Sequence, residues 1–327
     1  MRTKVKAHTN IALIKYWGKR DERLNLPAVG SISLTLDALW TETEIEFNVR
    51  FKTDRLILNG QPATEKELRR TSKFLDLLRQ RAGLSSPALI SSKNNFPTAA
   101  GLASSASGFA ALTVAAARAL KLELSGRELS IFARQGSGSA ARSIFGGFVE
   151  MHAGRLADGS DAFAEPIVPP DYWDIRLLIG VTSQVAKKVS STAGMNLSKE
   201  TSPYYQAWIN AQPVDLKTMR RAIEQRDFEQ IGQLAEHSCL KMHALALSSN
   251  PGILYWNGVT VEAMHSVRDL RASGTQAYFT IDAGPQIKAL CLPEDEPKVR
   301  AMLESIPGIQ QVISCAPGPA PQILEVE

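Results

Sequence analysis

The chain has 327 residues, of which 44% are hydrophobic and 21% are charged. This composition is typical of a globular protein with two domains or one large two-lobed unit. The net charge of +4 is small and scattered, which argues against nucleic acid as a partner and suits a small anionic substrate. The three cysteines form no CxxC pair, and no apolar stretch is long enough for a bilayer. We therefore expect no metal or disulfide framework, no membrane contact and a cytoplasmic location.

Residues 3–16 are the first predicted element, a short strand that leads into an apolar turn. Asn10 interrupts this apolar run and needs a hydrogen-bond partner if it is buried. Lys15 and Lys19 then place positive charge beside aromatic rings. This basic turn has two interpretations: a solvated surface turn anchored by Trp17, or one side of an anion site.

Several stretches before residue 93 carry the signals of strands, a hairpin and a helix. Alternation or a short apolar run predicts strands at 31–36, 41–49, 55–58 and 88–92. Asn59-Gly60 follows the third of these and predicts a β-hairpin. Thr64-x-x-Glu67 is a capping box, which predicts that a helix begins there.

The stretch from Asn94 to Ser107 begins as a turn and ends as the start of an apolar helix. Small residues from Ala99 to Gly101 let a ligand approach the backbone, and serines follow in the first helical turn. Free N–H groups at a helix N-terminus bind anions, so a phosphate site is one interpretation. Close packing in a core is the other. The stretch contains neither the Walker pattern nor the dinucleotide fingerprint.

A second segment rich in glycine and serine follows the helix that the capping box Ser125-x-x-Glu128 predicts. Residues 136–143 are predicted to form a turn that contains Arg142 and runs into a strand. Arginine can bind a carboxylate or phosphate through two parallel N–H groups, so this turn is a candidate anion site. A structural ion pair is the alternative interpretation of Arg142.

The C-terminal half alternates strands with long helices after a polar, proline-containing boundary at 158–170. The predicted strands are 175–181, 311–314 and 322–326. The predicted helices are 203–225, 226–247, 257–272 and 294–306. Residues 187–195 are predicted to form a turn that offers basic and hydroxyl groups. His237 and His243 are six residues apart and do not share a helical face, so they are expected to be structural or rim residues.

Asp282 stands where a β-rich run stops and Gly284-Pro285 follows. A strand fixes such a carboxylate while the following loop exposes it, which is typical of catalytic positions. An Asx-turn or a helix cap is the alternative interpretation.

Four blocks of the sequence together resemble one family. They are Ala7–Lys19, Pro97–Ser105, Ser137–Ser143 and Phe279–Pro285. The second block resembles the glycine/serine loop of the GHMP kinase superfamily, and the four together look like the mevalonate diphosphate decarboxylase family. The blocks occur in family order and the resemblance covers essentially the whole chain.

The resemblance implies an α+β fold with two lobes of α/β type, a GHMP kinase-like architecture with the active-site cleft between the lobes. The implied ATP-binding lobe is 1–165 and the implied second lobe is 166–327, whose C-terminal strands pack back on the first. The implied reaction converts mevalonate 5-diphosphate and ATP to isopentenyl diphosphate, ADP, phosphate and carbon dioxide. Mg²⁺ would bridge the ATP phosphates, and a homodimer is expected.

The resemblance also implies roles for individual residues. Asp282 would orient the C3 hydroxyl of the substrate and take its proton. Arg142, assisted by Asn10, would clamp the substrate carboxylate, and Lys19 would hold the diphosphate. The other implied substrate-binding residues are Tyr16, Lys15, Ser137, Gly138, Ser139, Ser191 and Met195. The implied ATP-binding residues are Asn94, Asn95, Pro97, Ala99, Ala100, Gly101, Leu102, Ala103, Ser104 and Ser105. No side chain is assigned as a direct Mg²⁺ ligand.

Two positions depart from the family pattern. Ala141 stands where members usually have cysteine, so a thiol is not required for the chemistry. Thr192 stands where some bacterial relatives carry arginine, which removes a potential diphosphate contact. Whether the substrate is a monophosphate or a diphosphate therefore stays open.

Three rival functions are compatible with parts of the sequence. A GHMP small-molecule kinase would stop after phosphorylation, but such kinases place a catalytic aspartate before a Gly-Gly pair, and here 136–147 holds Arg142 and no acid. A decarboxylase acting on phosphomevalonate or 3,5-bisphosphomevalonate is a closer rival. A nucleotide-binding module without catalysis is the third, and the joint presence of Asp282, Arg142, Lys19 and Asn10 argues against it.

Overall fold

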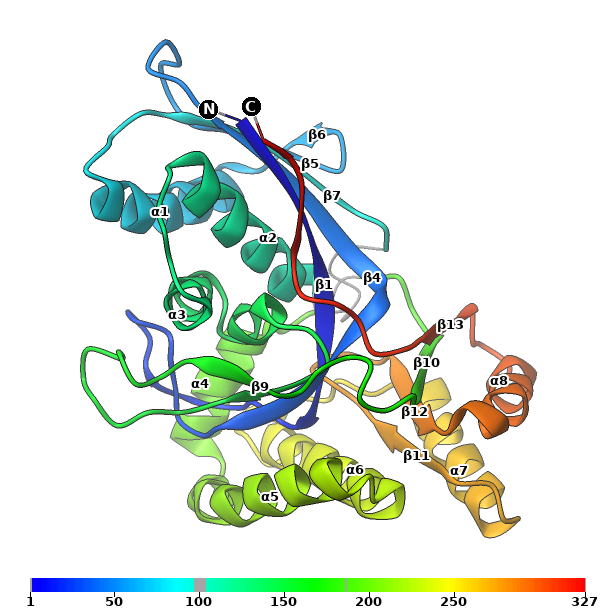
Figure 1. The fold of residues 1–327 in the computed structure, drawn as a ribbon. Helices are drawn as coiled ribbons and strands as arrows, with labels where there is room; N and C mark the ends of the chain where they lie inside the picture. Colours follow the sequence, from blue (N-terminus) through cyan, green and yellow to red (C-terminus); the bar gives the residue numbers. More distant parts are fainter. Residues whose placement is uncertain (1, 97–103, 186, 327) are drawn as a thin grey trace.

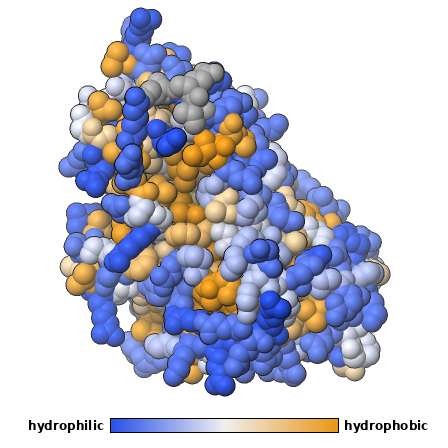
Figure 2. Space-filling model, in the orientation of Figure 1, coloured by the Kyte–Doolittle hydropathy of each residue, from blue (hydrophilic) through white to orange (hydrophobic). Residues whose placement is uncertain are grey.

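The computed structural model describes residues 2–96, 104–185 and 187–326 of the chain. Two β-sheets and the helices packed around them form a mixed α+β fold, as predicted (Figure 1). No helix in these ranges is both long and apolar enough to cross a membrane. Hydrophilic side chains dominate the face seen in Figure 2, with apolar ones gathered toward its middle.

The larger sheet has eight strands. They are β1 (Arg2–Ile14), β4 (Ser31–Phe47), β5 (Arg55–Leu58), β6 (Gln61–Pro62), β7 (Ala88–Asn94), β8 (Phe148–Met151), β9 (Ala164–Val168) and β14 (Gln322–Val326). The main path runs β14-β1-β4-β7-β5-β6, while β8 pairs with β4 and β9 with β8. β5 and β7 pair in parallel and the other neighbours are antiparallel. A separate small pair consists of β2 (Lys19–Asp21) and β3 (Leu26–Pro27).

β4 is one continuous strand, so the prediction of separate strands at 31–36 and 41–49 is wrong. Residues 31–36 are buried throughout, whereas buried and partly exposed positions alternate from Leu39 onward. β1 pairs with both parts of β4, and its register shifts between the pairs His8–Trp40 and Asn10–Thr35. Between those pairs the chain segment before β14 takes over, because Leu36 forms a bridge with Pro317 and Asp37 N–H donates to the Ala316 carbonyl. The alternating half is the part that pairs with β7.

Three helices pack against this sheet. They are α1 (Glu65–Ala82), α2 (Ser104–Ala119) and α3 (Gly126–Gly136). The predicted capping boxes at Thr64 and Ser125 are confirmed, because in both the N-cap side chain and the glutamate three residues later bond reciprocally. The hairpin at Asn59-Gly60 is also confirmed: it joins β5 to β6, and both residues have positive φ.

The smaller sheet has four antiparallel strands in the order β11-β12-β10-β13. They are β10 (Arg176–Val181), β11 (Ala277–Thr280), β12 (Ile287–Cys291) and β13 (Gln311–Cys315). The helices of this half are α4 (Ser191–Thr201), α5 (Tyr205–Gln225), α6 (Phe228–Leu247), α7 (Gly258–Ala272) and α8 (Glu296–Ser305), with a short 3-10 turn η2 (Pro293–Asp295). The four predicted helices are confirmed. The predicted turn at 187–195 is partly wrong, because Ser190 caps α4 and the helix begins at Ser191.

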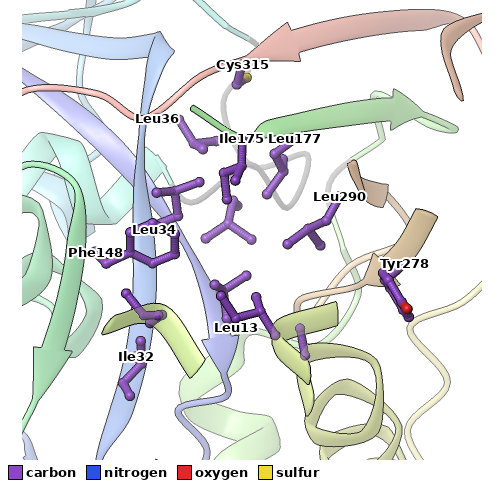
Figure 3. Close-up of a cluster of buried hydrophobic side chains, with 14 of the residues drawn as sticks. Leu13, Ile32, Leu34, Leu36, Phe148, Ile175, Leu177, Tyr278, Leu290 and Cys315 are labelled. Carbon is purple, nitrogen blue, oxygen red and sulfur yellow. The ribbon is translucent and has the colours of Figure 1, made fainter. Parts of the chain in front are cut away.

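The two sheets share one apolar core. Leu13, Leu34 and Phe148 reach it from the larger sheet, and Leu177 and Leu290 reach it from the smaller one (Figure 3). Helix α6 contacts both β1 of the larger sheet and β11 of the smaller one. At the opposite edge β14 pairs with β1, so the two ends of the described chain lie side by side (Figure 1).

Two helical glycines give opposite predictions for stability. A Cβ at Gly232 in α6 would lie 2.0 Å from Tyr278 Cδ2, whereas a Cβ at Gly108 in α2 would meet nothing within 4 Å. Gly108→Ala should raise the free energy of unfolding by up to about 1 kcal/mol, because alanine favours the helix. Gly232→Ala should lower it by about 1–3 kcal/mol through overpacking. Thermal unfolding measures both signs, and shifts in the same direction would contradict this packing of α6 on β11.

Candidate active site

Asp282 lies two residues beyond β11, and Lys15 follows β1 directly. Although they are 267 residues apart in sequence, Lys15 Nζ lies 2.6 Å from Asp282 Oδ1 in a hydrogen-bonded ion pair. Backbone contacts hold the lysine in place: Lys15 N–H donates to Ser238 Oγ at 3.0 Å, and its carbonyl accepts from Gln212 at 3.4 Å. The structure thus joins a predicted catalytic residue to a predicted basic one across the two sheets.

A second lysine approaches the other carboxylate oxygen. Lys288 Nζ, from the middle of β12, lies 3.3 Å from Asp282 Oδ2 as an ion pair without good hydrogen-bond geometry. The Lys15 and Lys288 side chains are 1% and 0% exposed, whereas that of Asp282 is 24% exposed. The Asp282 carboxylate therefore contacts two buried cations, one at each oxygen, and remains partly exposed.

The two ammonium groups keep Asp282 ionised. Burial by itself would raise the pKa of Asp282, but the charges of Lys15 and Lys288 and the hydrogen bond from Lys15 outweigh it and hold that pKa far below its usual range. Burial lowers the pKa of the Lys288 ammonium. Asp282 is consequently a strong source of negative potential and a weak base.

The residue before Asp282 is fixed by α6. The Cys239 thiol accepts from Ile281 N–H at 3.2 Å and donates to the Ile281 carbonyl at 3.5 Å, and His243 Nε2–H donates to the same carbonyl at 3.3 Å. Burial lowers the pKa of His243 to about 3, so the imidazole is neutral at physiological pH. His243 is structural, in agreement with the prediction from its spacing.

Arg142 is a buried cation that makes only neutral contacts. Its Nε donates to Asn10 Oδ1 at 3.1 Å and its Nη1 to Ser31 Oγ at 2.6 Å. No acidic side chain in the described ranges forms an ion pair with it, so the interpretation as a structural ion pair is not supported there. Burial lowers the pKa of Arg142 to about 10, which leaves it charged at neutral pH, and Asp282 is near enough to act on that pKa. The remaining guanidinium N–H groups are available to an anion.

The segment around Arg142 is a 3-10 helix, η1 (Gly138–Ile144), and not the predicted turn. Its hydrogen bonds to β1 explain the difference, because Asn10 Nδ2 donates to the Ser139 carbonyl at 3.0 Å and to Ser143 Oγ at 2.8 Å. Asn10 therefore has the partners that its burial requires, and it orients Arg142. Ala141 is fully buried within η1 against Val149, so its role is packing.

The Tyr16 hydroxyl points into the segment that begins η1. A Cβ at Gly138 would lie 2.6 Å from Tyr16 Oη, so only glycine allows this approach. The hydroxyl is buried and has no hydrogen-bond partner among the described residues. Burial raises the pKa of Tyr16, so it remains a neutral donor. A ligand oxygen that accepts a hydrogen bond from this hydroxyl would satisfy it.

Lys19 and Arg70 form a further pair of neighbouring cations, and Thr192 contacts Lys19. Lys19 Nζ donates to Thr192 Oγ1 at 3.3 Å, in the first turn of α4. Burial lowers the pKa of Lys19, the charge of Glu22 opposes that shift, and Arg70 adds to it. Arg70 Nη2 donates to the Gly136 carbonyl at 2.8 Å, and its guanidinium lies 4.6 Å from the Phe109 ring centroid. Like charges gathered in this way favour an anionic ligand.

Lys187 links α4 to the loop that carries Asp282. Its Nζ donates to Ser191 Oγ at 2.7 Å and to the Ala283 carbonyl at 2.9 Å. Burial lowers the pKa of Lys187 to about 8, with Asp282 opposing and Lys288 reinforcing that shift. The predicted Ser191 is thus brought into the site through a lysine that sequence reasoning had not assigned.

The predicted ATP-binding residues are only partly described. Pro97, Ala99, Ala100, Gly101, Leu102 and Ala103 lie outside the described residues. Ser104 and Ser105 open α2, and Ser105 Oγ lies 3.2 Å from Ser137 Oγ, which in turn lies 3.4 Å from Ser139 Oγ. These hydroxyls connect the segment at the start of α2 with the Gly/Ser segment at 136–143, which is distant from it in sequence.

Asn94, Asn95 and Met195 have structural contacts. Asn94 Oδ1 accepts from Thr41 Oγ1 at 2.6 Å, and Asn95 bonds to the Trp40 N–H and the Ala38 carbonyl. Met195 is 5% exposed in an apolar cluster with Trp17. Binding roles for these three residues stay predictions.

Lys288, Lys187 and Arg70 complete the site and had no assigned role from sequence. Lys288 had a detectable signal, because it is the one charged residue in the apolar run Ile287–Cys291. A lysine in such a run is rarely buried without a partner. Arg70 lies on α1 among other basic residues and carried no distinguishing pattern.

Both halves of the chain match models of one protein family. Residues 7–164 match the diphosphomevalonate decarboxylase-like N-terminal domain, and residues 177–324 match the mevalonate 5-diphosphate decarboxylase C-terminal domain. The diphosphomevalonate decarboxylase of Ganoderma lucidum is 42% identical to this chain, over 85% of this chain and 75% of that protein.

Solved structures agree with the sequence comparison. Mevalonate diphosphate decarboxylase from Staphylococcus aureus superposes with a TM-score of 0.94 at 41% identity, covering 99% of this chain and 98% of that one. A complex of the protein abbreviated MDDEF with MVAPP, AMPPCP and magnesium gives a TM-score of 0.93 at 42% identity, covering 100% and 99% of the two chains. The predicted fold class and family are confirmed: the chain belongs to the diphosphomevalonate decarboxylase family.

Proposed function

We propose that this chain catalyses the ATP-dependent decarboxylation of mevalonate 5-diphosphate to isopentenyl diphosphate, releasing ADP, phosphate and carbon dioxide. The observation that carries the proposal is a fixed carboxylate, Asp282, close enough to act on the pKa of Arg142, a buried guanidinium that makes only neutral contacts. Family membership supports the same reaction.

Asp282 would accept a hydrogen bond from the C3 hydroxyl and orient it toward the γ-phosphate of ATP. The two lysines make Asp282 a weak base, but this suits a loose phosphoryl transfer. In such a transfer the hydroxyl would lose its proton to Asp282 late, when the forming bond to phosphorus has already made that proton strongly acidic. After transfer, the same carboxylate would stabilise positive charge at C3 as the C3–O bond breaks and phosphate leaves.

Arg142 would bind the substrate carboxylate until carbon dioxide departs. The electrons of the breaking carbon–carbon bond become the double bond of the product as the C3–phosphate bond breaks. A buried guanidinium would position that carboxylate through hydrogen bonds and charge, without forming a covalent bond to it. Asn10 keeps the guanidinium in place. A kinase that stops at phosphorylation has no need of such a group, which favours decarboxylation over the kinase alternative.

The diphosphate would bind to the cations around the N-terminus of α4. Lys19 and Arg70 approach from one side, and the hydroxyls of Ser191 and Thr192 lie in the first helical turn. Tyr16, Ser137 and Ser139 would add hydroxyl donors. A decarboxylase for phosphomevalonate or 3,5-bisphosphomevalonate is the alternative, and the number of cations at this end favours the diphosphate.

ATP would bind at the start of α2, with Ser104 and Ser105 donating to its phosphates. No group of three or more His, Cys, Asp or Glu that suits a metal occurs in the described ranges. The nearby oxygen donors, which are serine hydroxyls and Asp282, fit an Mg²⁺ ion held chiefly by the ATP phosphates. When bound, the ion would neutralise charge on those phosphates.

Further proposals concern organisation. We propose that the chain acts as a cytoplasmic homodimer, which family resemblance suggests and which free, buried thiols at all three cysteines suit. We also propose that the ATP-binding lobe ends near residue 165 and the second lobe begins after it. The change from the larger sheet at β9 to the smaller sheet at β10 supports a division in this region.

A substrate panel tests the proposed reaction. With MgATP, the purified chain should release carbon dioxide and phosphate from mevalonate 5-diphosphate faster than from the monophosphate or the 3,5-bisphosphate. Asp282→Asn should lower kcat by about 10³-fold, because orientation and charge stabilisation are both lost. Asp171→Asn, at an exposed aspartate, is the control. ADP without carbon dioxide would identify a kinase, and absence of turnover would refute both enzyme functions.

Arg142→Lys keeps the positive charge but removes the planar guanidinium. That group donates to Asn10 and Ser31, and we propose that its other N–H groups bind the substrate carboxylate. We expect kcat for decarboxylation to fall at least about 10²-fold. Arg221→Lys, at an exposed position, should leave kcat unchanged. Steady-state kinetics measure both variants. A rate near that of the unmodified chain in Arg142→Lys would remove Arg142 from the carboxylate clamp.

Lys187 predicts an alkaline limb in the pH profile. Its pKa is lowered to about 8, so its ammonium is lost as the pH rises through that value and phosphate binding weakens. The kcat/KM of the unmodified chain should therefore fall above about pH 8. Lys187→Met should have a lower kcat/KM at pH 7 and lack this fall, whereas Lys188→Met, at the exposed neighbour, should keep it. An unchanged alkaline limb in Lys187→Met would exclude Lys187 as its source.

A further inference from the structure

Lys288 occupies a position that the fold otherwise gives to apolar residues. It lies in the middle of β12, opposite Ile179 of β10 and Thr280 of β11. Residues directly opposite each other in antiparallel strands share a face of the sheet, and Ile179 faces the apolar core between the two sheets. The lysine side chain is 0% exposed there.

Packing does not account for an ammonium group at this position. A buried charge destabilises a fold unless an opposite charge compensates it. Among the described residues, Asp282 is the acidic group that forms an ion pair with Lys288, and Lys288 Nζ has no hydrogen-bond partner there. The contact at 3.3 Å to Oδ2 is thus the feature that explains a lysine in this strand.

We propose that Lys288 is a positioning residue for the reaction. It holds Oδ2 of Asp282 from β12 while Lys15 holds Oδ1 from β1, and together they fix the plane of the carboxylate against the substrate hydroxyl. One ammonium alone would leave the carboxylate free to rotate about its Cβ–Cγ bond. The second, from another strand and on the other oxygen, removes that freedom. This role rests on the proposed function of Asp282.

The charged and titratable groups around Asp282 come from every element packed against it. They are Lys15, Arg142, Lys187, Cys239, His243 and Lys288. Lys15 and Lys288 are the two that contact the carboxylate directly. Removing Lys288 takes away one of the charges that favour the ionised carboxylate, so Asp282 would be protonated at a higher pH than before.

Lys288→Met tests the role kinetically, because methionine suits the apolar surroundings. We expect kcat to fall about 10- to 100-fold through misplacement of the carboxylate, with the KM for mevalonate 5-diphosphate changed less than about threefold. Ile179→Met, on the same face of the neighbouring strand, should change neither kcat nor KM. A kcat of Lys288→Met equal to that of the unmodified chain, or a rise in KM that accounts for the whole loss in kcat/KM, would overturn the proposal.

A thermodynamic cycle tests the same contact without substrate. Asp282→Asn leaves two buried ammonium groups uncompensated and should lower the Tm, and adding Lys288→Met should restore part of that loss. If Lys288→Met shifts the Tm equally with and without Asp282, the two residues are not coupled and the proposal fails. Absence of turnover in the unmodified chain would instead refute the proposed function, while this cycle would still report on the contact.

Discussion

The structure depends on one charged interaction, the carboxylate of Asp282 held between the ammonium groups of Lys15 and Lys288. All three are contributed by strands or strand ends that meet only in the folded chain. A buried ion pair needs good geometry to offset its desolvation, so it is satisfied only when β1, β11 and β12 are correctly placed. The apolar core between the sheets brings these strands together, and the ion pairs then fix where the strand ends point. The apolar core therefore brings the strands close together, and the ion pairs determine the orientation of their ends.

Positive charge exceeds negative charge throughout the site. Asp282 already neutralises part of the charge of two lysines, and the other cations of the site form no ion pair with an acidic side chain in the described part of the chain. They are Arg142, Lys187, Lys19 and Arg70. The protein therefore holds a preorganised field that anionic ligands complete, with little reorganisation when they bind. Burial lowers the pKa values of Lys187 and Arg142, and a bound anion would offset that desolvation.

Local signals in the sequence predicted local structure well. Capping boxes at Thr64 and Ser125 depend on residues three positions apart, and both helices begin where predicted. The errors occur where partners distant in sequence determine the structure. β4 stays continuous because β1 pairs with both of its parts and residues 316–317 bond to the stretch between them, and Asn10 donates to the Ser139 carbonyl within η1. The same limit explains Lys288, whose partner is found only when β12 is placed beside β11. Asp282 and Arg142 were predicted as site residues from motifs, whereas the contacts of Asp282 with Lys15 and Lys288 are visible only in the fold.

The pairing of β14 with β1 has a consequence for how this chain folds. β1 carries Asn10 and leads directly to Lys15, and one of its edges is completed by the strand most distant from it in sequence. Such contacts give a high contact order, and closing so long a loop is entropically costly and slow. During synthesis the N-terminal half would therefore wait with an exposed strand edge until nearly the whole sequence had left the ribosome. Maturation of the site would be among the last events of folding, coupled to sheet closure rather than to assembly of the N-terminal half alone.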